Sequence, residues 1–232
     1  MARRVLITGA TRGIGRFLAE HYLSHGDTVI GCGRSAPAIE HPQYSHHVAD
    51  VTSEEAVKAM FSAVRAAHDG LDVLINNAGA ASMNAFALTP PSTVRRIVDI
   101  NVIAPMLLTH GATRLMRRSP AARIVNLTTI AVPLRLEGEA VYAASKAAIE
   151  IFTRVVAKEL GPMGITCNAV GPSVIKTRLT EGVPADKLAR LVASQAIRRQ
   201  AEPADVANVI DFFLRPESGM VTGQIVYLGG FG

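Results

Sequence analysis

The sequence has no tryptophan, only two cysteines and 5% aromatic residues in 232 positions. Cys32 and Cys167 lie in apolar, strand-like surroundings, which favours small buried side chains over a disulfide or a metal site. The longest stretch without charge, residues 73–94, contains asparagine, serine and proline, which a bilayer core would penalise. The apolar run after Arg4 is too short for a secretory signal. We expect a cytoplasmic protein with no membrane partner and no metal.

The charge balance favours an anionic ligand. Twenty-four basic and 19 acidic residues give a net charge of +5. The basic residues fall in scattered pairs, such as Arg3-Arg4 and Arg117-Arg118, without interleaved aromatic residues, so we expect no nucleic-acid partner. A 49% hydrophobic content excludes a disordered chain.

Short apolar runs alternate with segments of helical periodicity along the chain. The runs predict strands at residues 5–7, 28–32, 46–48, 73–75, 123–127, 165–170 and 224–228. The periodic segments predict helices at residues 14–25, 53–68, 92–118, 140–160 and 203–214. Such alternation predicts an α/β fold, a single domain over residues 1–232 with a doubly wound parallel sheet and helices on both faces. Residues 176–200 fit this pattern poorly and are either a substrate lid or a plain surface helix.

A glycine-rich turn follows the first predicted strand, with the sequence Thr8-Gly9-Ala10-Thr11-Arg12-Gly13-Ile14-Gly15. Glycines allow a tight turn and a close approach to a pyrophosphate, whose charge the N–H groups of the next helix can bind. A turn without a ligand would look similar. The strand–turn–helix context favours a dinucleotide.

Three motifs in order resemble the short-chain dehydrogenase/reductase family, and most closely its 3-oxoacyl-(acyl carrier protein) reductase-like group. They are the wide spacing from Gly9 to Gly13, Asn76-Asn77-Ala78-Gly79 after the fourth strand, and Tyr142-Ala143-Ala144-Ser145-Lys146. The resemblance spans residues 4–228. It implies a Rossmann-like fold, a nicotinamide cofactor and cofactor contacts from Gly9, Thr11, Arg12, Gly13, Ile14, Gly15, Arg34, Asp50, Val51, Asn77, Ala78, Gly79, Tyr142, Lys146, Pro172, Ile175 and Thr177.

The choice of cofactor is argued from charge. An acidic residue closing the second strand selects NAD in this family, and Gly33 stands at that place. Arg34 and Arg12 can instead flank a 2′-phosphate, so we predict NADP(H) over NAD(H), although Arg34 alone is also compatible with a solvated loop charge. Asp50 and Val51 resemble the adenine-contacting pair of the family, but Asp50 is equally suited to cap the next helix.

Tyr142 and Lys146 are four residues apart, which places both on one helix face. An ammonium beside a phenol, together with the nicotinamide charge, is expected to lower the pKa of Tyr142 toward the working range of a general acid/base. The resemblance assigns the hydroxyl that holds the substrate oxygen to Thr129, where the family usually has serine, with Thr128 as the neighbouring alternative. It also assigns Asn101 to a water-mediated proton path; satisfying a helix kink near Pro105 is the rival role.

The loop after the sixth strand resembles the segment of the family that reaches over the nicotinamide. Pro172, Ile175 and Thr177 would contact the cofactor there, while Ser173 stands where glycine is usual. The serine leaves the backbone of that loop less free.

These features predict an oxidoreductase that reduces a carbonyl to a secondary alcohol with NADPH. The substrate is a small molecule or is bound to an acyl carrier, as in a 3-oxoacyl thioester; the alternatives are a sugar, polyol or small secondary-alcohol dehydrogenase and a non-catalytic NADP-binding sensor or scaffold. By resemblance we expect a homodimer or homotetramer that packs through the helices around Asn101 and Tyr142.

Overall fold

The computed structural model describes residues 2–36, 39–177, 180 and 182–230. Its strands form one sheet in the order β3-β2-β1-β4-β5-β6-β7, with every pair parallel. The strands are β1 (Arg4–Thr8), β2 (Thr28–Gly33), β3 (Tyr44–Val48), β4 (Val73–Asn76), β5 (Arg123–Leu127), β6 (Thr166–Gly171) and β7 (Ile225–Tyr227). This order confirms the predicted doubly wound, Rossmann-like α/β fold.

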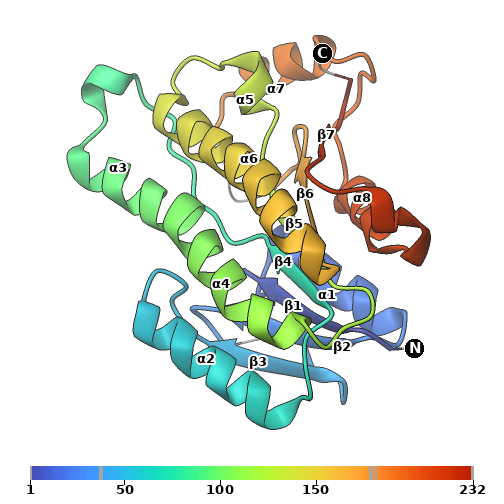
Figure 1. The fold of residues 1–232 in the computed structure, drawn as a ribbon. Coiled ribbons are helices and arrows are strands. Elements are labelled where there is room, and N and C mark those ends of the chain that lie inside the picture. Colours follow the sequence, from blue (N-terminus) through green and yellow to red (C-terminus); the bar gives the residue numbers. More distant parts are fainter. Residues whose placement is uncertain (1, 37–38, 178–179, 181, 231–232) are drawn as a thin grey trace.

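Helices cover both faces of this sheet, with α2, α4 and α6 on one face and α1 and α8 on the other (Figure 1). The α-helices are α1 (Gly13–Ser24), α2 (Glu54–Ala67), α3 (Pro91–Val98), α4 (Ala104–Met116), α5 (Ala131–Leu134), α6 (Ala140–Leu160), α7 (Ala185–Ala193) and α8 (Pro203–Leu214). Shorter turns are η1 (Phe86–Leu88), η2 (Asp99–Ile103), η3 (Gly161–Met163) and η4 (Pro216–Met220). The two-sided packing explains why the central strands β4 and β5 are buried along their whole length.

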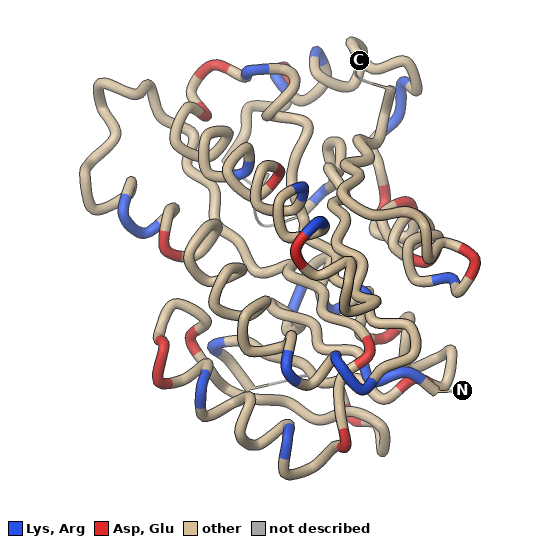
Figure 2. The backbone as a smooth tube through the Cα atoms, viewed as in Figure 1, with Lys and Arg blue, Asp and Glu red and all other residues tan. Residues whose placement is uncertain are grey.

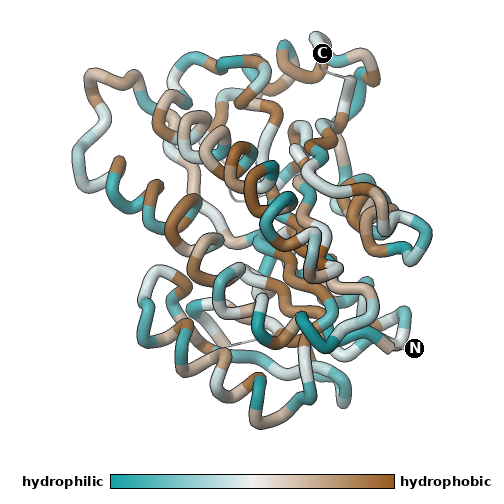
Figure 3. The backbone as a smooth tube through the Cα atoms, viewed as in Figure 1, coloured by the Kyte–Doolittle hydropathy of each residue, from teal (hydrophilic) through white to brown (hydrophobic). Residues whose placement is uncertain are grey.

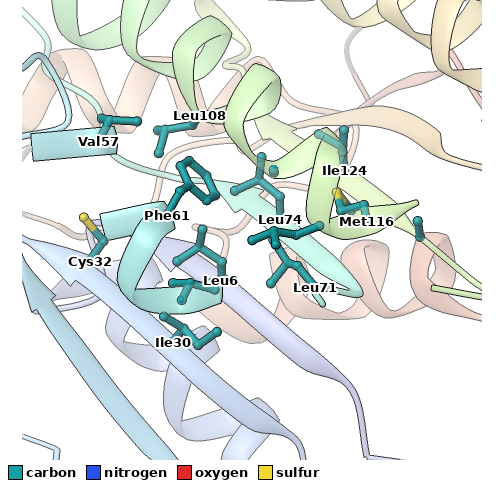
Figure 4. Packing of buried hydrophobic residues seen from close by; sticks show 14 of the residues in the cluster. Leu6, Ile30, Cys32, Val57, Phe61, Leu71, Leu74, Leu108, Met116 and Ile124 are labelled. Carbon is teal, nitrogen blue, oxygen red and sulfur yellow. The ribbon is translucent and has the colours of Figure 1, made fainter. Parts of the chain in front are cut away.

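Two hydrophobic cores lie on opposite sides of the sheet. Leu6 packs with Phe61 and Leu108 below α2 and α4 (Figure 4). Its neighbours Val5 and Ile7 belong to the other core, under α1 and α8, because successive side chains of a strand point to opposite faces. Figure 3 accordingly shows hydrophobic colour along the central strands, α4 and α6. The cysteines are both buried and free, as predicted.

The long helix predicted over residues 92–118 is wrong as one continuous α-helix. It is divided into α3, the π-helical turn η2 and α4, and the N–H of Ala104 donates to the carbonyl of Asp99, five residues back. Pro105 has no N–H and therefore cannot donate to the carbonyl of Asn101 in an α-helical ladder. A π turn accommodates this missing donor, and it places Asn101 inside the irregular segment.

Residues 176–200 leave the sheet and return to it. An isolated parallel bridge joins Ile175 to Ala201 at the base of this excursion, and α7 lies within it. Residues 178, 179 and 181 of the predicted lid lie outside the described residues. Part of residues 176–200 is therefore a helix, and the two alternatives of substrate lid and plain surface helix both remain compatible with it.

Charged residues of both signs are interspersed along the described chain (Figure 2). Within the described ranges, no helix is both long and apolar enough to cross a membrane.

Candidate active site

The glycine turn leads into an uncapped helix. Gly9 and Gly13 have φ angles of +69° and +55°, which side chains other than glycine rarely adopt. Arg12 occupies the N-cap position of α1 but its side chain makes no capping hydrogen bond. The first N–H groups of α1 are consequently left without a side-chain acceptor, as a phosphate-binding helix end requires.

The turn is packed tightly against the loop that follows β4. A Cβ atom at Gly15 would lie 2.3 Å from the carbonyl oxygen of Gly9 and 2.4 Å from Nδ2 of Asn77. That amide donates to the carbonyl of Thr8 at 2.8 Å, and the hydroxyl of Thr8 accepts from the backbone N–H of Asn77 and of Ala78. The two motifs, far apart in the sequence, therefore form one rigid unit at the carboxyl end of the sheet.

The end of β2 lies beside the glycine turn. A Cβ atom at Gly33 would lie 3.1 Å from Cγ2 of Thr11, so a longer side chain there would crowd the turn. Arg34 is exposed, and its charge helps to lower the pKa of Asp50, after the larger effect of hydrogen bonds from Thr52. Arg12 is exposed as well. The glycine turn and the end of β2 thus carry two guanidinium groups, those of Arg12 and Arg34, and residues 33 and 34 carry no carboxylate side chain.

Asp50 is not the cap of α2, so the alternative interpretation of its role was wrong. Ser53 occupies that position and its hydroxyl accepts from the N–H of Ala56 at 3.2 Å. Asp50 instead accepts from the N–H and the hydroxyl of Thr52 in a local turn. Val51 is buried in the core next to α2.

A cavity of about 520 Å³ opens at the carboxyl ends of the strands. The predicted site residues that line it are Ile14, Asn77, Gly79, Thr129, Tyr142, Lys146, Pro172, Ile175 and Thr177. The predicted residues outside the lining are Gly9, Thr11, Arg12, Gly13, Gly15, Arg34, Asp50, Val51, Ala78 and Asn101. The cavity reaches from the start of α1 to Leu188 and Leu191 on α7, so this helix forms one wall.

Tyr142 and Lys146 lie in this cavity, one turn apart on α6. Nζ of Lys146 donates to the carbonyl of Leu127, at the end of β5, at 2.7 Å. Burial lowers the pKa of Lys146 to about 8 and raises the pKa of Tyr142 to about 12. Without the coenzyme the Tyr142 pKa is therefore shifted upward, because loss of water around the phenol outweighs the hydrogen bond of Thr129. The lowering expected with a bound nicotinamide stays a prediction.

Thr129 and its neighbour Thr128 have different partners. The hydroxyl of Thr129 contacts Tyr142, where its hydrogen bond partly offsets the rise of the phenol pKa, and it accepts from the N–H of Ala131 at 3.2 Å. The hydroxyl of Thr128 donates to the buried carboxylate of Glu150 at 2.6 Å. Thr129 is thus the threonine whose hydroxyl faces the phenol.

The side chain of Asn101 is fully buried and fully hydrogen bonded. Its Oδ1 accepts from the N–H of Ala80 at 2.9 Å, and its Nδ2 donates to the carbonyl of Ala80 at 2.8 Å and to the hydroxyl of Ser145 at 2.9 Å. The amide therefore ties the π turn to the loop after β4 and to α6. The side-chain amide thus has a structural role that differs from satisfying the kink near Pro105. The path through water stays a prediction, and it would use the backbone carbonyl of Asn101.

The hydrogen-bond partner of Ser173 was not predictable from any local motif. Its hydroxyl bonds the buried amide of Gln195, just beyond α7, and accepts from the N–H of Val174 at 2.6 Å. The serine therefore fixes the loop after β6 to the end of the excursion rather than only stiffening it. Glu139 and Glu150 were also missed. Glu150 is paired with Thr128, 22 residues away, and Glu139 precedes Tyr142 by three residues without belonging to any of the three motifs.

Comparisons with solved structures agree with the topology. The aldohexose dehydrogenase of Thermoplasma acidophilum superposes with a TM-score of 0.90 at 28% identity, covering 99% of this chain and 94% of that one. A short-chain dehydrogenase of Leptospira borgpetersenii, solved with NAD⁺, has a TM-score of 0.90 at 25% identity, covering 100% of this chain and 92% of that one.

Curated relatives match over almost the whole chain. The 3-oxoacyl-[acyl-carrier-protein] reductases of Aquifex aeolicus and Vibrio harveyi are 30% and 29% identical, each covering 97% of this chain and 95% of the relative. A family model described as enoyl-(acyl carrier protein) reductase matches residues 9–231. With the parallel sheet and the three motifs at its carboxyl end, these matches show that the chain belongs to the short-chain dehydrogenase/reductase family and is an oxidoreductase that uses a nicotinamide dinucleotide.

Proposed function

We propose that this protein reduces a carbonyl to a secondary alcohol with NADPH. The observation that carries the proposal is the placement of Thr129, Tyr142 and Lys146 in one cavity that also borders the start of α1. A proton donor, a second hydroxyl and a cation thus lie beside the helix end that suits a pyrophosphate. The curated relatives that are 3-oxoacyl-[acyl-carrier-protein] reductases support the same reaction class.

The residues present fit a bound dinucleotide. The uncapped start of α1 would hold the pyrophosphate, and the Asn77–Gly79 loop together with Pro172, Ile175 and Thr177 would surround the nicotinamide end. When bound, the coenzyme supplies the hydride.

Tyr142 would give its proton to the substrate oxygen while Thr129 donates a hydrogen bond to the same atom. A phenol with a pKa of about 12 is almost fully protonated near neutral pH, and this state suits a proton donor in the direction of reduction. Lys146, with a pKa of about 8, would bind the nicotinamide ribose. Its ammonium can also return a proton toward Tyr142 after the phenol has given its own to the substrate. The backbone carbonyl of Asn101 would hold the water that resupplies the proton.

The preference for NADP(H) over NAD(H) rests on charge. Two exposed arginines, Arg12 and Arg34, flank the end of β2, and Gly33 offers no carboxylate to the ribose hydroxyls. A planar guanidinium matches the oxygens of a 2′-phosphate. The solved Leptospira borgpetersenii neighbour contains NAD⁺, so the proposed preference rests on Arg12 and Arg34 of this chain and not on that neighbour.

The proposed substrate is a 3-oxoacyl thioester or a smaller ketone, with a sugar or polyol dehydrogenase as the second candidate. The aldohexose dehydrogenase, at 28% identity, supports the second candidate. We further propose a cytoplasmic homodimer or homotetramer. Exposed Ile151 and Val155 on α6 suit packing against a second copy.

The test is the fall of NADPH absorbance with a panel of ketones, using the wild-type protein and Tyr142→Phe. We expect turnover by the wild-type protein and a loss of about 10²-fold or more in kcat in the variant, because it keeps the ring and loses the proton. A non-catalytic sensor would bind NADPH and turn over no ketone. Full activity of Tyr142→Phe would refute the assigned role of the phenol.

A further inference from the structure

Glu139 is an unpaired carboxylate on the wall of the candidate active site. It precedes Tyr142 by three residues and borders the same cavity. It stands at the N-cap position of α6, but its side chain makes no capping hydrogen bond, although carboxylates commonly cap helices from that position. Among the described residues, no hydrogen bond or ion pair engages this carboxylate. The backbone of Glu139 is bonded instead, since its N–H donates to the carbonyl of Leu136 and its carbonyl accepts from the N–H of Ala143.

The charge of Glu139 affects the pKa of the proposed proton donor. Its negative charge contributes to the raised pKa of Tyr142, after the larger effect of burial, so the carboxylate lies within electrostatic range of the phenol. Burial also raises the pKa of Glu139 itself. The other titratable groups on the cavity wall are Glu137 before α6, Tyr142 and Lys146 on α6, and Lys187 and Arg190 on α7.

A substrate that fills the cavity displaces water from this carboxylate. An apolar substrate offers no replacement donor, and a half-buried carboxylate then loses solvation without compensation. A substrate with a donor restores the lost hydrogen bond, and a bond to a charged acceptor in a dry cavity is stronger than one between neutral groups. The Glu139 carboxylate therefore discriminates between ketones according to whether a hydrogen-bond donor lies near the reacting carbon.

We propose that Glu139 is a specificity-determining residue that accepts a hydrogen bond from a hydroxyl or ammonium group on the substrate. This inference rests on the proposed reduction of a carbonyl by the same site and narrows its substrate class. It favours polar, donor-bearing ketones over plain aliphatic chains, and so favours the smaller ketone or the sugar and polyol candidate over a simple 3-oxoacyl thioester. The carboxylate also acts on Tyr142, since its charge stabilises the protonated phenol.

The test compares three ketones of similar size: cyclohexanone, 3-hydroxycyclohexanone and 3-aminocyclohexanone. The wild-type protein, Glu139→Gln and Glu137→Gln are assayed for kcat/KM with NADPH, after circular dichroism has shown that all three are folded. Glutamine keeps the size of glutamate and removes its charge. Glu137 provides the matched control because it is exposed on the same wall and does not contribute to the pKa of Tyr142.

We expect the wild-type protein to favour at least one donor-bearing ketone over cyclohexanone by about tenfold or more in kcat/KM. In Glu139→Gln this ratio should fall by about tenfold, and in Glu137→Gln it should stay the same. A larger fall for the amine than for the alcohol would identify an ammonium as the preferred group, and the reverse would identify a hydroxyl.

The pH profile gives a readout that a purely structural role would not move. Removing the negative charge lowers the pKa of Tyr142, so the alkaline fall of kcat/KM should begin at a lower pH in Glu139→Gln than in the wild-type protein. Glu137→Gln should keep the wild-type profile.

The outcomes separate this inference from the proposed function. Reduction of all three ketones with equal kcat/KM, or a donor preference that Glu139→Gln leaves intact, would show that Glu139 does not select the substrate, while carbonyl reduction itself would stand. If no ketone on a broad panel is reduced with either NADPH or NADH, the proposed function is wrong and this inference fails with it.

Discussion

Replacing Asn101 with aspartate should destabilise the protein in a pH-dependent manner. The two side chains have the same shape, but aspartate carries an oxygen where Nδ2 donates to the carbonyl of Ala80 and to the hydroxyl of Ser145. That hydroxyl already donates to the carbonyl of Tyr142 at 2.7 Å, so its single proton is not free for the new oxygen. The substitution therefore places an acceptor against two acceptors in a fully buried site.

The magnitude follows from the count of lost bonds. Each buried hydrogen bond that is broken with its partner left unsatisfied costs about 1–3 kcal/mol, so the loss of both donations amounts to about 4 kcal/mol at neutral pH. A protonated aspartic acid regains one donation, to Ala80. The pKa of Asp at position 101 in the folded state should consequently lie above its unfolded value of about 4.

The sign of the pH effect follows from this raised pKa. The proton-dependent stabilisation of the variant is fully present below about pH 4 and is lost as the pH rises through the folded-state pKa. The difference in unfolding free energy between the wild-type protein and the variant should therefore grow by up to about 1.4 kcal/mol per pH unit within that window.

Urea unfolding followed by circular dichroism at pH 5 and pH 7.5 measures this difference. Asn84→Asp is the matched control, because Asn84 is exposed and its side chain bonds only Ser82 among the residues that the structure describes. The effect of this control should stay within about 0.5 kcal/mol at both pH values. An Asn101→Asp protein as stable as the wild type at pH 7.5, or a difference that does not change with pH, would refute the structural role assigned to this amide.

Two further predictions concern the cofactor and the end of the excursion. The double variant Arg12→Ala/Arg34→Ala should raise the KM for NADPH by about 10- to 100-fold and change the KM for NADH by less than about threefold, because only NADPH carries the 2′-phosphate. Steady-state kinetics with both coenzymes measures the two KM values. An equal rise for both coenzymes would contradict the assignment. Asp205 accepts from Arg199 and from the N–H of Glu202, and these bonds lower its pKa to about 2. A lowered folded-state pKa stabilises the protein above the unfolded value near 4 and loses that effect as the pH falls toward 2. Asp205→Asn should thus cost about 1 kcal/mol at neutral pH, and the cost should shrink between pH 4 and pH 2 in urea unfolding; a constant cost would contradict this reasoning.

The sheet and the glycine turn were predictable from the sequence because both depend on local patterns. Apolar runs such as residues 73–75 have no polar face, and this indicates a strand covered on both sides. Gly9 and Gly13 adopt the positive φ angles that only glycine accepts readily, so residue type alone pointed to the turn. Ser53 was likewise predicted to begin a helix, and it caps α2.

The features that could not be predicted depend on burial or on residues that lie far away in the sequence. Pro105 indicated a break in the long helix, but the π turn that absorbs its missing N–H was not predictable from local pattern. Gln195 and Glu150 lack any sequence signal, since their partners Ser173 and Thr128 are each 22 residues away. The direction of the Tyr142 pKa shift depended on burial, which a spacing of four residues does not reveal.

The geometry of the site depends on helix α6 as a whole. Tyr142, Lys146 and Glu150 are spaced four residues apart and therefore lie along one face of this helix. Lys146 bonds the carbonyl of Leu127 and Glu150 accepts from the hydroxyl of Thr128, so two successive turns of α6 are fixed to successive residues at the end of β5. The next residue of the chain, Thr129, is the one whose hydroxyl meets the phenol. The distance between the two groups proposed to hold the substrate oxygen is thus set by buried bonds beside the cavity, which keeps the proton donor in place before any substrate binds.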